Sequence, residues 1–154
     1  LVDELLARRH PAVAIGGISM GAFIALGAAI AEPRLAAVVS ILGSPDWTPK
    51  SGHVPDDLRE AVAGDPQRRM DRFAPRPVLL LNAGRDQHVS PEPARRFQAA
   101  LREQAHYAGR PQDVVHHEYP ESDHFVREED WRDLWARTLA FLGRTLQADP
   151  ARPL

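Results

Sequence analysis

A serine between two glycines is the side chain of this chain best placed to do chemistry. Residues 17–21 have the sequence Gly-Ile-Ser-Met-Gly and directly follow the apolar run 12–15. This pattern between a strand and a helix is typical of a nucleophile elbow, a tight turn that presents the serine hydroxyl above a sheet. We expect glycine at 17 and 21 because a Cβ atom there would collide with the strand or the incoming helix. The N-terminus of that helix favours negative charge that develops beside Ser19.

A serine hydroxyl is a weak nucleophile at neutral pH and needs a base within hydrogen-bond reach. The base is a histidine whose second ring nitrogen is oriented by a carboxylate. Two later loops contain these groups, with Asp86 after the apolar run 78–82 and His124 after the run 114–119. Ligands of open α/β sheets bind at the carboxyl ends of the strands. The sequence therefore predicts that Ser19, Asp86 and His124 meet there.

The elements that must position these residues alternate between strand and helix. Three continuous apolar runs predict strands buried on both faces, and a run of mixed polarity at 113–119 predicts a strand nearer a sheet edge. Strands are predicted at 12–18, 36–42, 77–82 and 113–119, and helices at 1–10, 20–32, 91–106 and 128–147. Alternation of this kind predicts a three-layer α/β fold, with a mostly parallel sheet of about four strands flanked by helices.

Two segments carry further expectations. Residues 43–75 are irregular and rich in proline, with short helices expected near 56–63 and 66–73, and they form an excursion from the carboxyl side of the sheet. In the last helix, apolar side chains recur on one stripe, which we expect to pack in the core. They are Trp131, Leu134, Trp135, Leu139 and Leu142. A length of 154 residues suits a single domain over 1–154.

Composition excludes several classes of function. A formal net charge of −2 gives no electrostatic basis for binding nucleic acid or an anionic membrane. There is no cysteine, which excludes disulfides, thiolate metal sites and a cysteine nucleophile. No apolar stretch is long enough to span a bilayer, and the first residues lack a signal-peptide pattern. We expect a cytoplasmic protein that needs no cofactor or metal.

Three motifs together resemble the α/β-hydrolase superfamily. The order Ser19, Asp86, His124 is the order of nucleophile, acid and histidine in that superfamily. The acid turn at 82–89 and the Ser-Asp-His-Phe loop at 122–125 are similar to its other two motifs, and Phe-Ala-Pro-Arg-Pro at 73–77 resembles the esterase and prolyl-oligopeptidase-like branch. The resemblance extends from residue 12 to about residue 146.

The resemblance implies a role for each residue. Ser19 would be the acyl-accepting nucleophile, His124 the general base and then acid, and Asp86 the group that fixes the histidine tautomer. The backbone N–H of Met20 would be one donor of the oxyanion hole. The implied function is that of a serine hydrolase that cleaves a carboxylic ester or related acyl bond through an acyl-enzyme. Ester, thioester, lactone and peptide substrates all remain open.

The chain also departs from the family pattern. In the full fold four strands precede the elbow strand, and a loop after the third supplies a second oxyanion-hole donor. Here one short helix precedes the elbow, so the resemblance implies the C-terminal part of the fold, in a truncated or minimal form. Loss of one donor costs about 10²–10³ in rate. The alternative function is therefore a catalytically weak or inactive remnant with a structural or interaction role.

An apolar elbow strand at a sheet edge would leave backbone N–H and C=O groups unpaired, which favours pairing with another strand. We expect either a homo-oligomer formed through this edge or the adjoining helices, or binding of a missing N-terminal segment there. In a homo-oligomer, two elbow strands would pair antiparallel about a two-fold axis.

Other polar residues and glycines of the sequence allow alternative assignments. Asp123 could replace Asp86, although it is adjacent to His124. His88 could compete as the base but lies in the loop of the acid, so we expect it to line the site or face solvent. His116 and His117 with Glu118 suggest a metal site, yet neighbouring residues of a strand point to opposite faces. The glycines at 16–21 lack the Lys-Ser/Thr of a phosphate loop.

Overall fold

The computed structural model describes residues 1–8, 10, 12–104, 106–107 and 109–146. Its centre is a sheet of four parallel strands in the order β1-β2-β3-β4, so that strands consecutive in sequence are neighbours in space. The strands are β1 (Ala14–Ile18), β2 (Ala37–Ile41), β3 (Val78–Ala83) and β4 (Val114–Tyr119). The predicted parallel sheet of about four strands is confirmed.

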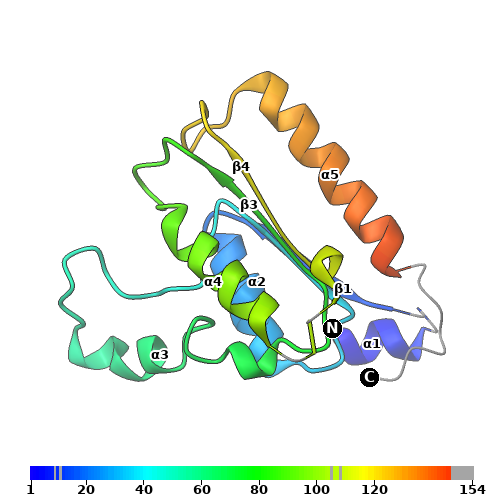
Figure 1. The fold of residues 1–154 in the computed structure, drawn as a ribbon. Helices are drawn as coiled ribbons and strands as arrows, with labels where there is room; N and C mark the ends of the chain where they lie inside the picture. Colours follow the sequence, from blue (N-terminus) through cyan, green and yellow to red (C-terminus); the bar gives the residue numbers. More distant parts are fainter. Residues whose placement is uncertain (9, 11, 105, 108, 147–154) are drawn as a thin grey trace.

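Helices cover both faces of this sheet (Figure 1). The helices α2 (Met20–Ala31) and α4 (Glu92–Glu103) lie on one face, and α5 (Glu128–Leu146) lies on the other. The remaining helices are α1 (Val2–Ala7), α3 (Arg59–Ala63) and the 3₁₀ turns η1 (Asp56–Leu58), η2 (Met70–Arg72) and η3 (Pro111–Asp113). The three-layer α/β fold predicted from the sequence is confirmed.

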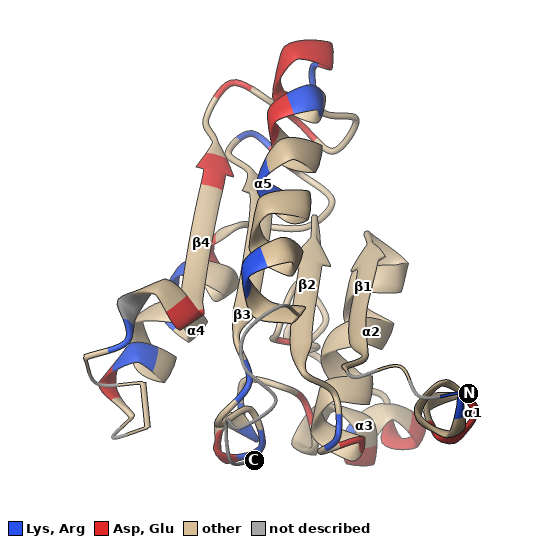
Figure 2. Cartoon of the chain, turned by 90° about the vertical axis from the view of Figure 1, so that its right-hand side faces the viewer, with Lys and Arg blue, Asp and Glu red and all other residues tan. Residues whose placement is uncertain are grey.

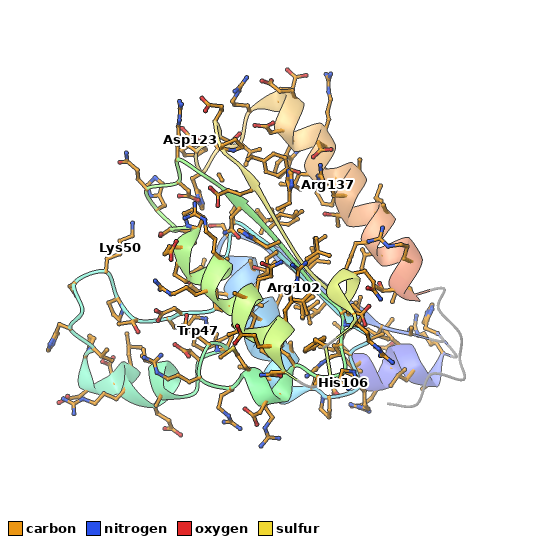
Figure 3. The ribbon with its side chains drawn as sticks, in the orientation of Figure 1. Trp47, Lys50, Arg102, His106, Asp123 and Arg137 are labelled. Carbon is orange, nitrogen blue, oxygen red and sulfur yellow. The ribbon has the colours of Figure 1, made fainter. Side chains whose placement is uncertain are left out.

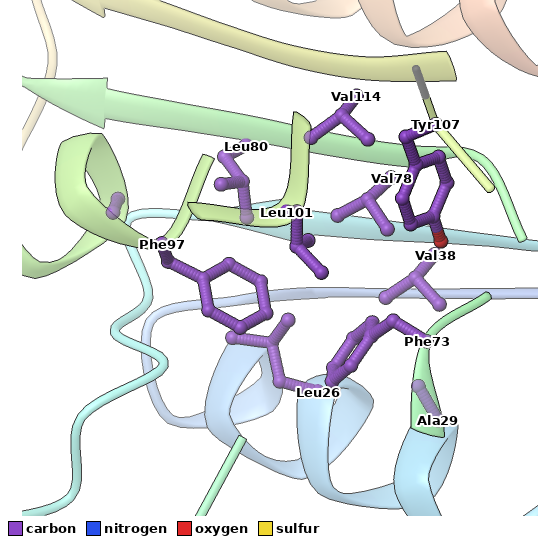
Figure 4. Packing of buried hydrophobic residues seen from close by; sticks show 11 residues of the cluster. Leu26, Ala29, Val38, Phe73, Val78, Leu80, Phe97, Leu101, Tyr107 and Val114 are labelled. Atoms are coloured by element: carbon purple, nitrogen blue, oxygen red, sulfur yellow. The ribbon is translucent and has the colours of Figure 1, made fainter. Parts of the chain in front are cut away.

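The two central strands divide their side chains between two hydrophobic cores. Every residue of β2 and β3 is buried, because each strand has a neighbour on both sides and helices above and below. Val78 and Leu80 point into a cluster with side chains of α2 and α4, where Phe73 packs edge-on against Phe97 with ring centroids 5.1 Å apart (Figure 4). Leu79 and Leu81 point into the second cluster, beneath α5.

Small side chains bring α2 close to the sheet. Ala22, Ala25 and Ala29 are fully buried, and α2 packs against both β1 and β2. The excursion at 43–75 rests on the same helix, since a Cβ atom on Gly27 would lie 2.9 Å from the ring of Trp47. Buried Asp65 organises this segment by accepting hydrogen bonds from the backbone N–H groups of Trp47 and Arg68.

One burial prediction is wrong and one is right only in part, for one reason. The run 12–18 predicts a strand buried on both faces, but β1 begins at Ala14, and Gly16 and Ile18 are exposed. In the predicted core stripe of α5, Leu134 is buried and Trp131 and Leu142 pack against the core, but Trp135 is 41% and Leu139 66% exposed. β1 is an edge strand, and α5 packs over β2 and β3. The α5-side face of β1 and the adjoining side of α5 therefore lack a covering element among the described residues.

Smaller boundary differences occur elsewhere. Of the helix predicted near 66–73, only η2 and turns form. The last helix is described to Leu146, so its predicted end at 147 lies outside the described residues.

None of the helices in the described part of the chain combines the length and the apolar character that crossing a membrane would require.

The packing of the core predicts that truncation of two different phenylalanines changes the free energy of unfolding by different amounts. Phe73 has no exposed surface, whereas Phe125 is 83% exposed. Truncation of a buried phenylalanine removes its transfer free energy and leaves a cavity. We expect Phe73→Ala to lower the free energy of unfolding by about 3–5 kcal/mol in urea titrations. The control Phe125→Ala should change it by less than about 0.5 kcal/mol. Equal losses in the two variants would contradict the described packing.

Candidate active site

Ser19 sits in a strained turn between β1 and α2. Its φ of 53° and ψ of −119° lie in a region that residues with a side chain rarely adopt. The turn is held on both sides, since the Ser19 N–H donates to the carbonyl of Ile41 in β2 at 2.8 Å and the Ser19 carbonyl accepts from the N–H of Ala22 at 2.9 Å. The strand pairing and the helix start thus fix the direction of the serine hydroxyl.

The two glycines of the motif differ in their roles. A Cβ atom on Gly17 would lie 2.0 Å from the carbonyl oxygen of Gly21 and 2.7 Å from the nitrogen of Ala22, so the predicted need for glycine at 17 is confirmed. The same prediction for Gly21 is wrong, because a Cβ atom there meets nothing within 4 Å beyond its own helix. The close approach of α2 to β1 therefore requires glycine at position 17 but not at position 21.

The structure brings Ser19, His124 and Asp86 into one chain of hydrogen bonds. The Oγ of Ser19 lies 2.9 Å from Nε2 of His124, and Nδ1 of His124 lies 2.7 Å from Oδ2 of Asp86. The Asp86 side chain is 1% exposed and that of His124 18% exposed. A buried carboxylate thus orients a histidine whose other ring nitrogen faces an accessible hydroxyl.

The acid loop holds Asp86 through the backbone. Oδ1 of Asp86 accepts hydrogen bonds of 2.8 Å from the N–H groups of both His88 and Val89. These bonds leave Oδ2 directed at the imidazole. The loop also packs closely on the loop of the histidine, since a Cβ atom on Gly84 would lie 2.8 Å from the Cα of Pro120. Asp86 and His124 are therefore positioned as one unit.

The histidine loop depends on residues to which the sequence analysis gave no role. Ser122 is fully buried, donates from its hydroxyl to Asp130 of α5 at 2.7 Å and accepts from the N–H of Arg127 at 3.0 Å. Val126 has a φ of 41°, which strains a β-branched residue, and its buried side chain packs in the core beneath α5. The feature of the sequence that could have indicated a role for Ser122 is a small polar residue two positions before His124.

The structure also decides between the alternative polar residues. Asp123, near the tip of this loop in Figure 3, accepts the N–H of Phe125 at 2.9 Å, which closes a local turn. Asp86 and not Asp123 is thus the carboxylate on the imidazole. His88 is exposed, and its ring centroid lies 5.2 Å from that of His124, so it lines the site.

The histidines of β4 point to opposite faces of the sheet. Glu118 forms an ion pair with Arg95 of α4, and His117 packs against Tyr119 beneath α5. The Nε2 atom of His116 is buried without a hydrogen-bond partner. Across the described residues, no group of three His, Asp or Glu side chains is arranged to hold a metal ion.

The first residue of α2 carries the candidate donor for an oxyanion beside Ser19. Met20 is the first residue of α2, where the helix offers no internal acceptor for the backbone N–H. The dipole of the helix favours negative charge at the same point. The Met20 side chain is 76% exposed and turns away from the core. Its N–H therefore remains the oxyanion-hole candidate that the motif indicated.

An open cleft of about 490 Å³ lies beside His124. The acid and histidine loops line it, and its walls include Gln87, His88 and Phe125. Its two arginines each pair with a glutamate, Arg85 with Glu121 and Arg127 with Glu129. The excursion reaches this cleft, since Lys50 donates to the backbone carbonyl of Gln87 (Figure 3). Sequence reasoning did not single out Phe125 as a lining residue.

Comparison with known proteins agrees with this architecture. Neither a protein-family model nor a curated protein matches the sequence. Among solved structures, TT1662 from Thermus thermophilus is similar with a TM-score of 0.77 and 23% identity, over 96% of this chain and 60% of that one. A puromycin-hydrolyzing peptidase from Mycobacterium tuberculosis is similar with a TM-score of 0.75 and 26% identity, over 96% of this chain and 24% of that one. The chain thus spans less than two thirds of either protein.

The acylaminoacyl peptidase of Pyrococcus horikoshii is also similar, with a TM-score of 0.71 and 14% identity, over 99% of this chain and 27% of that one. These neighbours are α/β-hydrolases. The chain has the α/β-hydrolase fold, and the resemblance predicted from its three motifs is confirmed at that level.

The unequal roles of the two glycines predict unequal effects of alanine. Gly17→Ala places a methyl group against the backbone of α2, so we expect loss of the elbow geometry and at least a hundredfold loss of reaction between Ser19 and a fluorophosphonate. Gly21→Ala adds the same methyl group where it meets no atom beyond the helix and should retain most of the reactivity. Circular dichroism would verify folding, and equal losses in both variants would contradict this account.

Burial of His116 should make the free energy of unfolding depend on pH. Burial lowers the pKa of His116 below its ordinary value of 6.5, so the folded chain holds it neutral more firmly than the unfolded chain does. Its contribution to stability is present above that value and is lost as the pH falls below it, because the unfolded state then binds more protons. We expect His116→Leu to make the acid loss of unfolding free energy shallower in urea titrations between pH 8 and pH 5. His53→Leu, at an exposed histidine, controls for loss of a histidine as such.

Proposed function

We propose that this chain is a serine hydrolase that cleaves a carboxylic ester or related acyl bond through an acyl-enzyme on Ser19. The hydrogen-bonded series from the Ser19 hydroxyl through His124 to Asp86 carries the proposal. The similarity to structures described as a puromycin-hydrolyzing peptidase and an acylaminoacyl peptidase supports the same chemistry.

In the first step, Oγ of Ser19 attacks the carbonyl carbon of the substrate while Nε2 of His124 takes the hydroxyl proton. The π electrons of the carbonyl move to its oxygen, which the N–H of Met20 stabilises as an oxyanion. Asp86 accepts a hydrogen bond from the proton on Nδ1 of His124, which leaves Nε2 unprotonated and able to accept the serine proton. The negative charge of Asp86 also stabilises the imidazolium that forms.

In the second step, the carbonyl re-forms and the bond to the leaving group breaks, with the proton on Nε2 transferred to the departing oxygen or nitrogen. Water then attacks the acyl-enzyme while His124 again takes a proton, and Ser19 leaves with that proton as the acid is released. No group beyond these side chains and water is needed to balance the reaction.

The cleft beside His124 is polar, with one aromatic side chain among its lining residues. The Phe125 ring is exposed with its centroid 6.1 Å from that of His124, and His88 faces both rings edge-on. Two arginines, Arg85 and Arg127, and two carboxylates, Glu121 and Asp123, line the cleft, so its formal charges balance. Short esters are therefore proposed as the least specialised substrates with which to test the chain.

The second candidate is a catalytically weak or inactive remnant with an interaction role. The observation that favours it is the open side of β1, next to the elbow, where the described residues place no further strand. An oxyanion held by the Met20 N–H alone would react about 10²–10³ more slowly than one held by two donors.

Labelling with a fluorophosphonate probe and hydrolysis of p-nitrophenyl acetate together test the proposal. We expect the chain to be labelled, Ser19→Ala to abolish labelling, and the exposed-site control Ser51→Ala to leave it unchanged. Asp86→Asn should lower kcat by about 10⁴ because the histidine then takes the wrong tautomer. Labelling that survives Ser19→Ala would refute the assignment of the nucleophile. A folded chain that is never labelled would favour the remnant.

A further inference from the structure

The loop that carries His124 is closed by the side chain of Ser122. Its Oγ accepts a hydrogen bond of 3.0 Å from the backbone N–H of Arg127, and His124 lies between these two residues in the sequence. Ser122 has no exposed surface, so water cannot replace the partners of its hydroxyl. Each bond of a buried hydroxyl must therefore be made within the protein.

Asp130 of α5 accepts the proton of this hydroxyl, at 2.7 Å from Oδ2. In a capping box, the side chain of the third helical residue accepts the N–H of the residue that caps the helix. Arg127 caps α5, because its carbonyl accepts the N–H of Trp131, and Asp130 is the third residue of the helix. The Ser122 hydroxyl is thus inserted into such a box, and it joins the start of α5 to the histidine loop.

Ser122 also bonds to the loop of the acid, through its backbone. Its carbonyl accepts the N–H of Arg85, the residue before Asp86, at 2.9 Å. Removal of the hydroxyl leaves this bond in place and breaks the two bonds to the start of α5. The backbone and the side chain of Ser122 therefore hold separate parts of the site, and a variant can separate their effects.

Asp130 differs from the other two acidic residues in the first turn of α5. Figure 2 shows the acidic residues of this turn in red at the upper end of the helix. The side chains of Glu128 and Glu129 are 78% and 61% exposed and pair with arginines at the surface. Attraction to the helix N-terminus accounts for carboxylates at all three positions. Of the three, Asp130 alone bonds to the loop that carries His124.

The geometry points to Asp130 as a positioning residue for His124, which acts through the hydroxyl of Ser122. Proton transfer requires His124 to keep Nε2 at 2.9 Å from Oγ of Ser19 and Nδ1 at 2.7 Å from Asp86. Asp130 fixes the hydroxyl that closes the loop, so the imidazole is held in this place before substrate binds. The kinetic consequence rests on the proposed hydrolase function, whereas the placement of the imidazole is a property of the fold.

Hydrolysis of p-nitrophenyl acetate tests the kinetic consequence. Asp130→Ala and Ser122→Ala should each lower kcat about tenfold or more, because the base is no longer held in place. Asp130→Asn keeps an oxygen that accepts the Ser122 proton and should retain kcat within about threefold. The control Glu128→Ala, at an exposed carboxylate of the same turn, should leave kcat unchanged. The double variant should lose no more than the worse single variant, because both changes break one chain of hydrogen bonds.

Proton NMR separates this inference from the proposed function. The proton between Nδ1 of His124 and Asp86 should give a far-downfield resonance, which is assigned by its loss in His124→Ala. We expect it to be sharp in the unmodified chain and in Asp130→Asn, and broadened by solvent exchange in Asp130→Ala and Ser122→Ala.

These spectra do not depend on turnover, so an inactive chain with the expected resonances would refute the proposed function alone. A resonance that is absent from the unmodified chain, or unchanged in Asp130→Ala, would overturn the positioning role. Equal broadening in Asp130→Asn and Asp130→Ala would also overturn it, because the charge of Asp130 and not its hydrogen bond would then be the cause.

Discussion

The hydrogen bond from the N–H of Ser19 to the carbonyl of Ile41 is the contact on which the candidate site depends. A non-glycine residue at a φ of 53° costs about 1–3 kcal/mol and persists only when its surroundings fix it. Pairing of β1 with β2 provides that constraint on one side, and close packing of α2 on Gly17 provides it on the other. The apolar sheet is therefore what holds the hydroxyl in its strained, accessible position.

The other two residues of the site are held by backbone contacts more than by charge. Asp86 is fixed by two N–H donors from its own loop, and the histidine loop is tied to α5 through Ser122. Contact between the two loops at Gly84 makes them a single support. A base held in this way loses little freedom when the reaction begins, which is the condition for efficient proton transfer.

The sequence predicted the features that arise from local patterns. β2 and β3 are continuous apolar runs with neighbours on both sides, so composition alone indicated their burial. The order of Ser19, Asp86 and His124 along alternating strands placed them at one sheet edge. Features that depend on tertiary neighbours were missed or wrong. The position of β1 at the sheet edge was expected from the family resemblance, but its apolar composition alone indicated burial on both faces. The stripe of α5 does not show how far the helix reaches. The strain at Val126 follows from packing that no local pattern encodes.

The edge strand and the nucleophile share one backbone, so the open side of β1 lies directly before the elbow. Residues of β1 alternate, so Ile18 faces the open side while Ser19, the next residue, bonds to β2. Whatever lies along this side of the sheet therefore borders the segment that holds Ser19, so the open edge and the strained turn belong to one part of the fold.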